Sequence, residues 1–493
     1  MRKKFGSFSV WSGLVIVIVI SFLLSGMAAA QESGGFSKMP LSPEFTRYVQ
    51  MMKAAKAGGT ALQKQGTSGH QFGYVPPPFV LPQIESGIAG HEELELLGLP
   101  KTYDLRTTGK LTEVRDQGQC GSCWAFGSYA ALESYLLPGE TTDFSEHNLM
   151  TCHGFDPGIC AGGNLFMTTA YLSRWNGPVL EQDDAYDINS YVCVPGTVQK
   201  HIQEALFIPR KSATANTDIK KAVMTYGAVA VSMFMYEGAP YLNSTTNAYY
   251  FNLRGQSSNH MVAIVGWDDN YSKINFSIKP KGNGAFIVRN SWGSGWGEAG
   301  YFYVSYYDTV FALGTNGVFD SAAPTTNYAK VYEYDPLGVV TWIGAGNSGW
   351  GANIFQAGGN ENLAAVAFYT PVKNSSYNIY IYTNVTAGSP RSGTLVRTIK
   401  GKIPMAGYHT INVPSVSLAG GQNFSVVVKL TTPGFRWPAP IEYPESGYSS
   451  GATAQAGQSF LSSNGKHWYD LTTLNIPGLD MTNANLCVKA FTN

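Results

Sequence analysis

This chain lacks an excess of charge of either sign. Lys+Arg and Asp+Glu both number 33, which gives a formal net charge of zero, and charged residues make up only 13% of the 493 residues. With no excess of positive charge, the sequence does not indicate binding to nucleic acid or to an anionic membrane surface. The scarcity of charge, together with 55 glycines and 29 tyrosines, is typical of β-rich extracytoplasmic proteins rather than of long charged helices.

Long apolar runs are also missing after the first 30 residues. The chain starts with three basic residues, Arg2-Lys3-Lys4, continues with an apolar run from Leu14 to Leu24 and reaches Ala28-Ala29-Ala30. This pattern predicts a signal peptide over residues 1–30 and hence a secreted protein. An uncleaved membrane anchor is the alternative, because the wider apolar stretch is almost long enough to span a bilayer.

Cysteine is scarce as well, with six in the chain: Cys120, Cys123, Cys152, Cys160, Cys193 and Cys487. Export makes disulfides plausible. Cys152-His153 has no second pair at zinc-like spacing, so no metal site is expected. The length itself predicts two folded domains plus processing segments.

Three separated motifs carry the chemistry. They are Gln117–Trp124, which contains Cys-Gly-Ser-Cys-Trp, then Asn259-His260, and then Asn290-Ser291-Trp292-Gly293. A cysteine followed about 130 to 150 residues later by a histidine and an asparagine is the order of a thiol–imidazole hydrolase. Cys-x-x-Cys is also a redox signature, but no βαβ pattern surrounds it here. From about residue 99 to 320 the chain resembles the papain-like (cathepsin-like) cysteine peptidases.

The resemblance implies an α+β fold of two lobes over residues 99–322, a helical lobe followed by a β-barrel-like lobe. Catalytic roles carry over to four positions. Cys123 is the expected nucleophile, His260 the proton carrier, Asn290 the residue that orients the imidazole, and Gln117 a donor to the oxyanion. No cofactor is implied, and the partners are protein or peptide substrates.

These residue types suit the chemistry. A thiolate is the reactive form of cysteine, and Cys123 begins an apolar pattern that predicts a helix up to Pro138-Gly139. The partial positive charge at a helix N-terminus favours an anion there. Peptide hydrolysis through a thioester intermediate follows if an imidazole shares the proton.

Further positions rest on the resemblance. Disulfides are expected between Cys120 and Cys160 and between Cys152 and Cys193, although the residues alone leave the connectivity open. Cys487 is expected to be a buried small apolar side chain.

The expected substrate-binding residues line the cleft of the family. Gly162 and Gly163 let a peptide backbone approach closely, with a simple turn as the alternative. Leu165 and Ser232 fall where an apolar pocket for the P2 side chain, the second residue before the scissile bond, is built. Trp292 is expected to shield the His260–Asn290 contact.

Two flanking regions complete the prediction. Residues 31–98 resemble a propeptide, with a flexible linker as the alternative. Residues 323–493 hold short strand-like runs between turn residues, which predict an all-β antiparallel sandwich. This region loosely resembles a lectin-like module. Its aromatic residues leave glycan binding open, with core packing as the alternative. A second hypothesis is a catalytically silent scaffold whose sandwich binds carbohydrate or cell-surface ligands.

Overall fold

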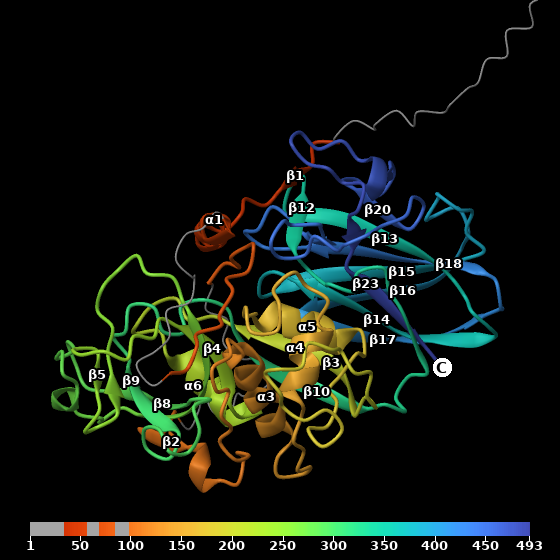
Figure 1. Cartoon of the computed structure of the whole chain (residues 1–493). Coiled ribbons are helices and arrows are strands. Elements are labelled where there is room, and N and C mark those ends of the chain that lie inside the picture. Colours follow the sequence, from red (N-terminus) through yellow and green to blue (C-terminus); the bar gives the residue numbers. More distant parts are fainter. Residues whose placement is uncertain (1–33, 57–68, 84–97) are drawn as a thin grey trace, which may run out of the picture.

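The computed structural model describes residues 34–56, 69–83 and 98–493. The expected signal peptide at 1–30 lies outside these ranges. Within them, no helix has both the length and the apolar character needed to cross a bilayer. Figure 1 shows a part in orange, yellow and green beside a mostly blue sandwich, with α1 above the junction.

The helical lobe forms where the sequence supplies caps and apolar faces. Ser145 accepts a hydrogen bond from the backbone of Asn148, and Asn164 accepts two from the first turn of the next helix, which satisfies N–H groups that lack partners within a helix. The helices of the described chain are α1 (Pro43–Lys56), α3 (Cys123–Leu136), α4 (Glu146–Cys152), α5 (Leu165–Ser173) and α6 (Thr217–Tyr226), with short 3-10 turns η1 (Leu105–Thr107), η2 (Lys273–Asn275) and η3 (Leu471–Thr473).

The β-rich lobe follows the helical one, as the sequence predicted. Its strands have buried faces on both sides at the centre of the sheet, which explains their nearly continuous apolar runs. They are β2 (Thr102–Asp104), β3 (Lys200–Ile208), β4 (Val229–Met233), β5 (Leu242–Asn243), β6 (Ala248–Tyr249), β7 (His260–Asp268), β8 (Ala285–Arg289), β9 (Tyr301–Ser305) and β10 (Asn316–Pro324).

The C-terminal sandwich is antiparallel throughout its pairings. Its six-stranded sheet has the order β16-β15-β18-β13-β20-β21. The strands after β10 are β11 (Lys330–Tyr332), β12 (Thr341–Gly344), β13 (Ser348–Gln356), β14 (Glu361–Thr370), β15 (Ser375–Thr383), β16 (Thr394–Ile403), β17 (Ala406–Leu418), β18 (Asn423–Thr431), β19 (Ala439–Glu442), β20 (Ser459–Ser462), β21 (Tyr469–Asp470), β22 (Asn485–Leu486) and β23 (Val488–Thr492).

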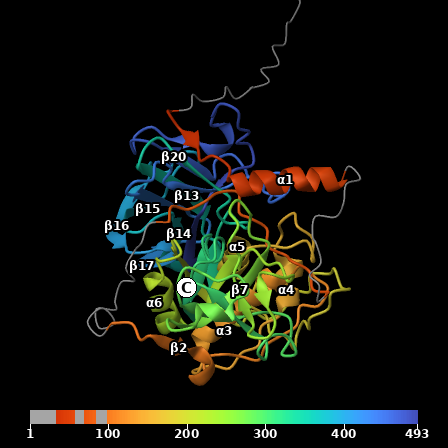
Figure 2. The ribbon, with the colours of Figure 1, turned by 90° about the vertical axis from the view of Figure 1, so that its left-hand side faces the viewer.

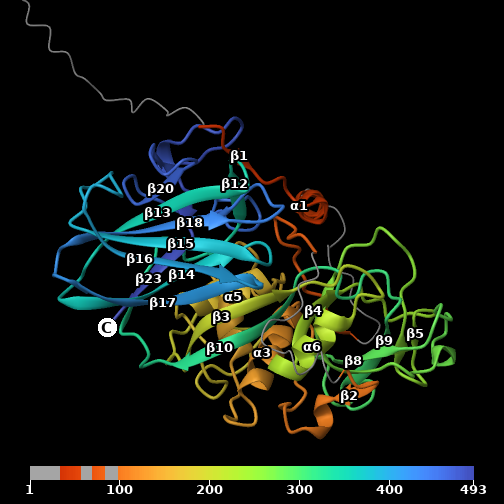
Figure 3. The same ribbon diagram turned by 180° about the vertical axis from the view of Figure 1, so that it is seen from behind.

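One sheet runs through both parts of the molecule. Its order is β11-β23-β14-β17-β3-β10-β4-β7-β8-β9-β6-β5, with β2 added beside β7. The joint is the antiparallel pairing of β17 with β3, in which Tyr408 lies opposite Ala205, and Figure 3 shows these strands side by side. β10 also extends to Pro324, so a strand crosses the predicted boundary between residues 322 and 323.

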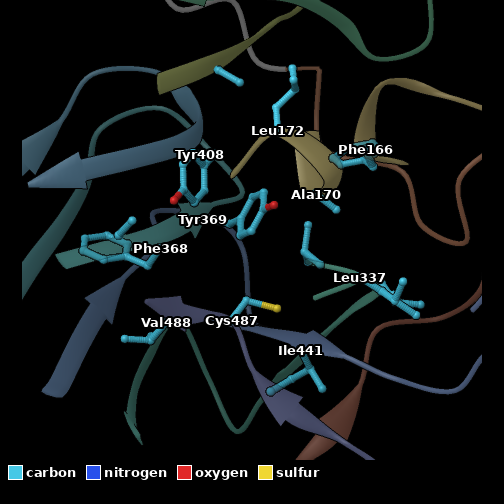
Figure 4. Packing of buried hydrophobic residues seen from close by; sticks show 14 of the residues in the cluster. Phe166, Ala170, Leu172, Leu337, Phe368, Tyr369, Tyr408, Ile441, Cys487 and Val488 are labelled. Atoms are coloured by element: carbon cyan, nitrogen blue, oxygen red, sulfur yellow. The ribbon is translucent and has the colours of Figure 1, made fainter. Parts of the chain in front are cut away.

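Apolar side chains fill the space between the helical lobe and the sandwich. Phe166 and Ala170 on α5 belong to the same buried cluster as Tyr369, Tyr408 and Cys487, and Figure 4 shows Ala170 on the side of the helix that faces Tyr369. Cys487 is buried and unpaired, as the expectation of a small apolar side chain required. The sandwich is therefore packed into the core of the molecule and is not a tethered module.

The N-terminal residues lie across this junction. β1 (Ser37–Lys38) pairs antiparallel with β12 of the sandwich, and Lys38 forms a 2.8 Å ion pair with Glu445. Helix α1 contacts the sandwich through Phe45, whose ring meets Tyr448 edge-on, and Figure 2 shows the helix from the side. Residues 69–83, called the cleft segment below, then pass between the two lobes.

Candidate active site

Cys123 is the first residue of helix α3. Just before the helix, the disulfide between Cys120 and Cys160 ties the loop to the glycines at 162 and 163, and a second disulfide joins Cys152 to Cys193. Both pairings implied by the resemblance are thus present, and Cys123 remains a free, fully buried thiol. The position leaves its sulfur at the end of the helix where N–H groups lack helical partners.

His260 and Asn290 meet because of the antiparallel pairing of β7 with β8. His260 begins β7 and Asn290 directly follows β8, whose last residue Arg289 lies opposite Ala263. Nε2 of His260 lies 2.8 Å from Oδ1 of Asn290. An amide oxygen accepts only, so Nε2 carries the proton and donates. This leaves Nδ1 as the nitrogen that can exchange a proton.

Nδ1 of His260 points into a buried site and has no hydrogen-bond partner among the described residues. Helix α3 packs against β7, with Gly127 near Met261 and Val262. The backbone N–H of Met261, the neighbour of His260, donates a hydrogen bond to the sulfur of Cys123. The thiol therefore lies at the start of β7, where the imidazole is attached.

The Cys123 thiol and the His260 imidazole are both neutral while residues 69–83 cover them. Burial raises the pKa of the Cys123 thiol to about 11, although hydrogen bonds from the backbone N–H groups of Met261 and Gly73 oppose the shift. Burial also lowers the pKa of His260 to about 4, opposed by the bond to Asn290. Desolvation disfavours the charged form of each group, so an ion pair between them requires the site to open.

Gln117 is also part of this arrangement. Its Oε1 accepts a 2.6 Å hydrogen bond from the hydroxyl of Ser291, which fixes the direction of the amide. Its Nε2 donates to the carbonyl of Cys120 and to the carbonyl of Gln71 in the cleft segment, both at 2.7 Å. The Gln71 carbonyl thus occupies one of the two donor positions of this amide.

The cleft segment runs along the glycines in extended form. Gly163 donates from its N–H to the carbonyl of Gly73 at 2.9 Å and accepts from the N–H of Val75 at 2.9 Å, so Tyr74 forms a parallel bridge with Gly163. The N–H of Tyr74 donates to the carbonyl of Asn259 at 3.0 Å. The segment is thus held as an added strand.

Glycine is required where this segment meets the loop before Cys123. A Cβ on Gly73 would lie 1.8 Å from the carbonyl oxygen of Gly121, and one on Gly162 would lie 2.5 Å from the carbonyl oxygen of Gly73. Gly162 also has φ of +103°, which side chains rarely adopt. The backbones therefore approach more closely than side chains permit.

An aromatic wall covers the His260–Asn290 contact. The ring centroid of Trp292 lies 5.1 Å from that of His260, and the His70 ring of the cleft segment stacks on Trp292 with centroids 5.2 Å apart. Phe72 meets His260 edge-on at 5.6 Å. Trp292 is 2% exposed, so water has little access to the hydrogen bond.

The two residues expected in the substrate pocket lie on different elements. Leu165 starts α5 and packs toward Gly317 of β10, where an added Cβ would lie 2.1 Å from it. Ser232 of β4 accepts a 3.1 Å hydrogen bond from Ser258 and interacts with the Tyr74 phenol of the cleft segment. Ser232 is therefore in contact with the chain that occupies the cleft.

The sequence motifs contain Ser291 and Asn259 but assigned no role to either, and they did not include the side chains of the cleft segment. Ser291 acts through a tertiary hydrogen bond, which a linear pattern does not reveal. For the cleft segment a signal existed: Pro76-Pro77-Pro78 favours an extended backbone directly after Gly73-Tyr74-Val75.

Comparison with known proteins identifies the family. Residues 99–317 match the family described as papain family cysteine protease, and residues 331–492 match the lectin like domain. Cysteine proteinase 1 of Entamoeba histolytica is 33% identical over 231 residues, which are 45% of this chain and 68% of that relative. The chain belongs to the papain family of cysteine proteases. Procathepsin L of Mus musculus is 30% identical over 224 residues, 43% of this chain and 63% of that protein.

Solved structures extend the similarity to the sandwich. The cysteine protease and lectin-like domains of Cwp84, a surface layer associated protein of Clostridium difficile, superimpose with a TM-score of 0.78 at 25% identity, over 94% of this chain and 99% of that one. The same clostridial protease after propeptide cleavage gives a TM-score of 0.69 at 26% identity, over 80% and 99% of the two chains. The predicted fold, a papain-like domain followed by an antiparallel sandwich, is confirmed.

Proposed function

We propose that this cysteine peptidase is a secreted endopeptidase that hydrolyses peptide bonds with Cys123, His260 and Asn290. The observation that carries the proposal is the 2.8 Å contact between His260 Nε2 and Asn290 Oδ1. It leaves Nδ1 available as the proton acceptor for the neighbouring thiol.

The reaction follows from these positions. Nδ1 of His260 takes the proton of the Cys123 thiol, and the thiolate attacks the carbonyl carbon to form a C–S bond. The oxyanion receives hydrogen bonds from the Gln117 amide and the backbone N–H of Cys123. His260 returns the proton to the leaving amine as the C–N bond breaks. A water molecule, deprotonated by His260, then cleaves the thioester and frees the carboxylic acid product.

We further propose that residues 31–98 are a propeptide that keeps the enzyme inactive. Hydrogen bonds of the cleft segment to Gly163, Asn259 and Gln117 support this role, since they use groups that a substrate would need. The backbone N–H of Gly73 also interacts with the sulfur of Cys123 and opposes the rise in the thiol pKa, so the segment lies against the proposed nucleophile. Propeptide cleavage in the clostridial relative is consistent with the same arrangement.

The test compares wild type with Cys123→Ala after proteolytic removal of the residues before Leu99. Wild type is expected to digest an unstructured protein substrate, and the variant is expected to be inactive. Mass spectrometry of the fragments distinguishes endopeptidase from terminal cleavage. Equal digestion by both proteins would contradict the proposal and favour a silent scaffold.

A specific observation favours glycan binding by the sandwich as a second function. Trp350 of β13 stacks on Tyr380 of β15 with ring centroids 5.5 Å apart, and Arg391 and Lys429 lie 5.8 and 5.4 Å from the Trp350 ring. Aromatic faces beside polar donors are suited to amphipathic ligands such as sugars. A glycan array probed with the full chain and with Trp350→Ala tests this function; equal signals from the two would contradict it.

A further inference from the structure

The contacts of one side chain of the cleft segment show which groups line the substrate pocket. Tyr74 is the residue that bridges to Gly163, and its side chain packs against the buried core beneath the cleft. The segment runs parallel to the Gly163 backbone. Chain direction changes which backbone atoms pair, but the walls that a side chain meets beside Gly163 are the same. The surroundings of Tyr74 therefore report the chemistry of that pocket.

The floor of this pocket is polar. The phenol of Tyr74 interacts with the hydroxyl of Ser232, which itself accepts a 3.1 Å hydrogen bond from Ser258. Ser232 is 1% exposed. Burial raises the pKa of Tyr74, while the hydrogen bond with Ser232 opposes the shift, so the phenol remains protonated. Because Ser232 accepts from Ser258, its own hydroxyl proton is available to donate to the phenol oxygen of Tyr74.

Space for the phenol depends on a glycine opposite. A Cβ on Gly314 would lie 2.9 Å from Oγ of Ser232 and 3.9 Å from the hydroxyl oxygen of Tyr74. The absence of a side chain at Gly314 therefore leaves the end of the pocket open. A residue larger than glycine at 314 would clash with Ser232, and a branched one would also reach toward the phenol hydroxyl.

We infer that Ser232, Ser258 and Gly314 make this a tyrosine-selecting pocket, so that substrates with tyrosine at P2 are preferred over those with phenylalanine or leucine. The inference rests on the proposed function and replaces the purely apolar pocket predicted from the sequence. This selectivity differs from a general preference for aromatic side chains, because the pocket recognises the hydroxyl of the substrate tyrosine. A phenylalanine at P2 leaves the Ser232 hydroxyl without that partner and therefore binds less well.

The experiment uses the processed enzyme and three fluorogenic peptides that differ only in Tyr, Phe or Leu at P2. Wild type is expected to favour Tyr over Phe by about threefold to tenfold in kcat/KM, the contribution of one net hydrogen bond. In Ser232→Ala the Tyr/Phe ratio is expected to fall to about one, because the variant loses the partner of the substrate hydroxyl and Tyr loses more activity than Phe. In Gly314→Val both aromatic substrates are expected to lose activity relative to Leu.

A binding measurement without turnover completes the test. A synthetic peptide of residues 69–83 and its Tyr74→Phe form are titrated into processed Cys123→Ala and into the Cys123→Ala, Ser232→Ala double variant. The hydroxyl is expected to improve binding only when Ser232 is present. Equal binding of both peptides to the single variant, or an unchanged Tyr/Phe ratio in Ser232→Ala, overturns the inference. Absence of Cys123-dependent cleavage of every peptide would instead contradict the proposed function.

Discussion

The carbonyl oxygen of Gln71 accepts a 2.7 Å hydrogen bond from the side-chain amide of Gln117. The residue proposed to stabilise the oxyanion is thus occupied by the N-terminal segment of its own chain. Two residues further on, the N–H of Gly73 donates to the sulfur of Cys123. The same short stretch engages the nucleophile and the oxyanion donor together, so its release frees both.

Gly73→Ala is expected to activate the uncleaved chain. The new Cβ would lie 1.8 Å from the carbonyl oxygen of Gly121. Accommodating this clash destabilises the state with the segment bound by about 1–3 kcal/mol. Release of the segment should increase by roughly tenfold to a hundredfold. Hydrolysis of a fluorogenic peptide by the unprocessed protein measures this. Gly451→Ala, where no atom lies within 4 Å of the new Cβ, is the control, and equal activity of the two variants would contradict the prediction.

Ionisation of Cys123 is expected to change when the segment leaves. With the segment bound, the thiol pKa is raised to about 11 and the His260 pKa is lowered to about 4 by burial. Thiolate should therefore form in the precursor only as the pH approaches 11, whereas the processed enzyme should show it near neutral pH. The thiolate ultraviolet absorbance of wild type minus Cys123→Ser gives the titration curve. Coincident curves for precursor and processed protein would exclude this effect.

Gln117→Ala is expected to lower kcat of the processed enzyme by about 10²–10³-fold, the usual effect of losing one oxyanion donor. Alkylation of Cys123 by iodoacetamide should continue at a similar rate, because this reaction forms no oxyanion. Comparing the two rates separates transition-state stabilisation from misfolding. Loss of both in parallel would indicate a structural role for the Gln117–Ser291 contact.

The sandwich and the peptidase region are expected to unfold together. Tyr369 is 1% exposed between them, and its hydroxyl is without a hydrogen-bond partner in the described structure. Tyr369→Ala should destabilise the chain by about 3–5 kcal/mol, as for other large aromatic truncations, while Tyr369→Phe should have little effect. Urea unfolding followed by activity and by tryptophan fluorescence checks this, and two separated transitions would argue against one shared core.

Glu442 is expected to make the fold more stable in mild acid. Burial raises its pKa to about 8, opposed by the hydrogen bond from Asn485. The folded state therefore holds a proton that the unfolded state releases above pH 4.5 or so. Its contribution to stability is complete below that pH and is lost as the pH rises through about 8. Measured Tm should therefore fall less between pH 5 and 8 in Glu442→Gln than in wild type. The control Glu113→Gln, at an exposed position, should show the same fall as wild type.

Local patterns predicted much of the catalytic region. Helix α3 begins at Cys123 and ends before Pro138, and strands β4, β7, β8 and β9 follow the apolar runs. The sequence did not single out β3, in which Gln203, Glu204 and Ala205 are good helix formers. Its pairing with β10 on one side and β17 on the other makes it a strand. Long-range pairing overrides local preference there.

The sequence by itself determined the order of the reactive residue types, the cysteine at a helix start and the two folded regions, because these depend on motifs and local periodicity. Tertiary structure alone decided that His260 meets Asn290, that Ser291 orients Gln117, that Tyr74 reaches Ser232, and that the sandwich shares a core and a sheet with the peptidase region. Each of these contacts joins residues distant in sequence or positions them through strand pairing. Their geometry exists only after the chain has folded and excluded water from the surfaces between them.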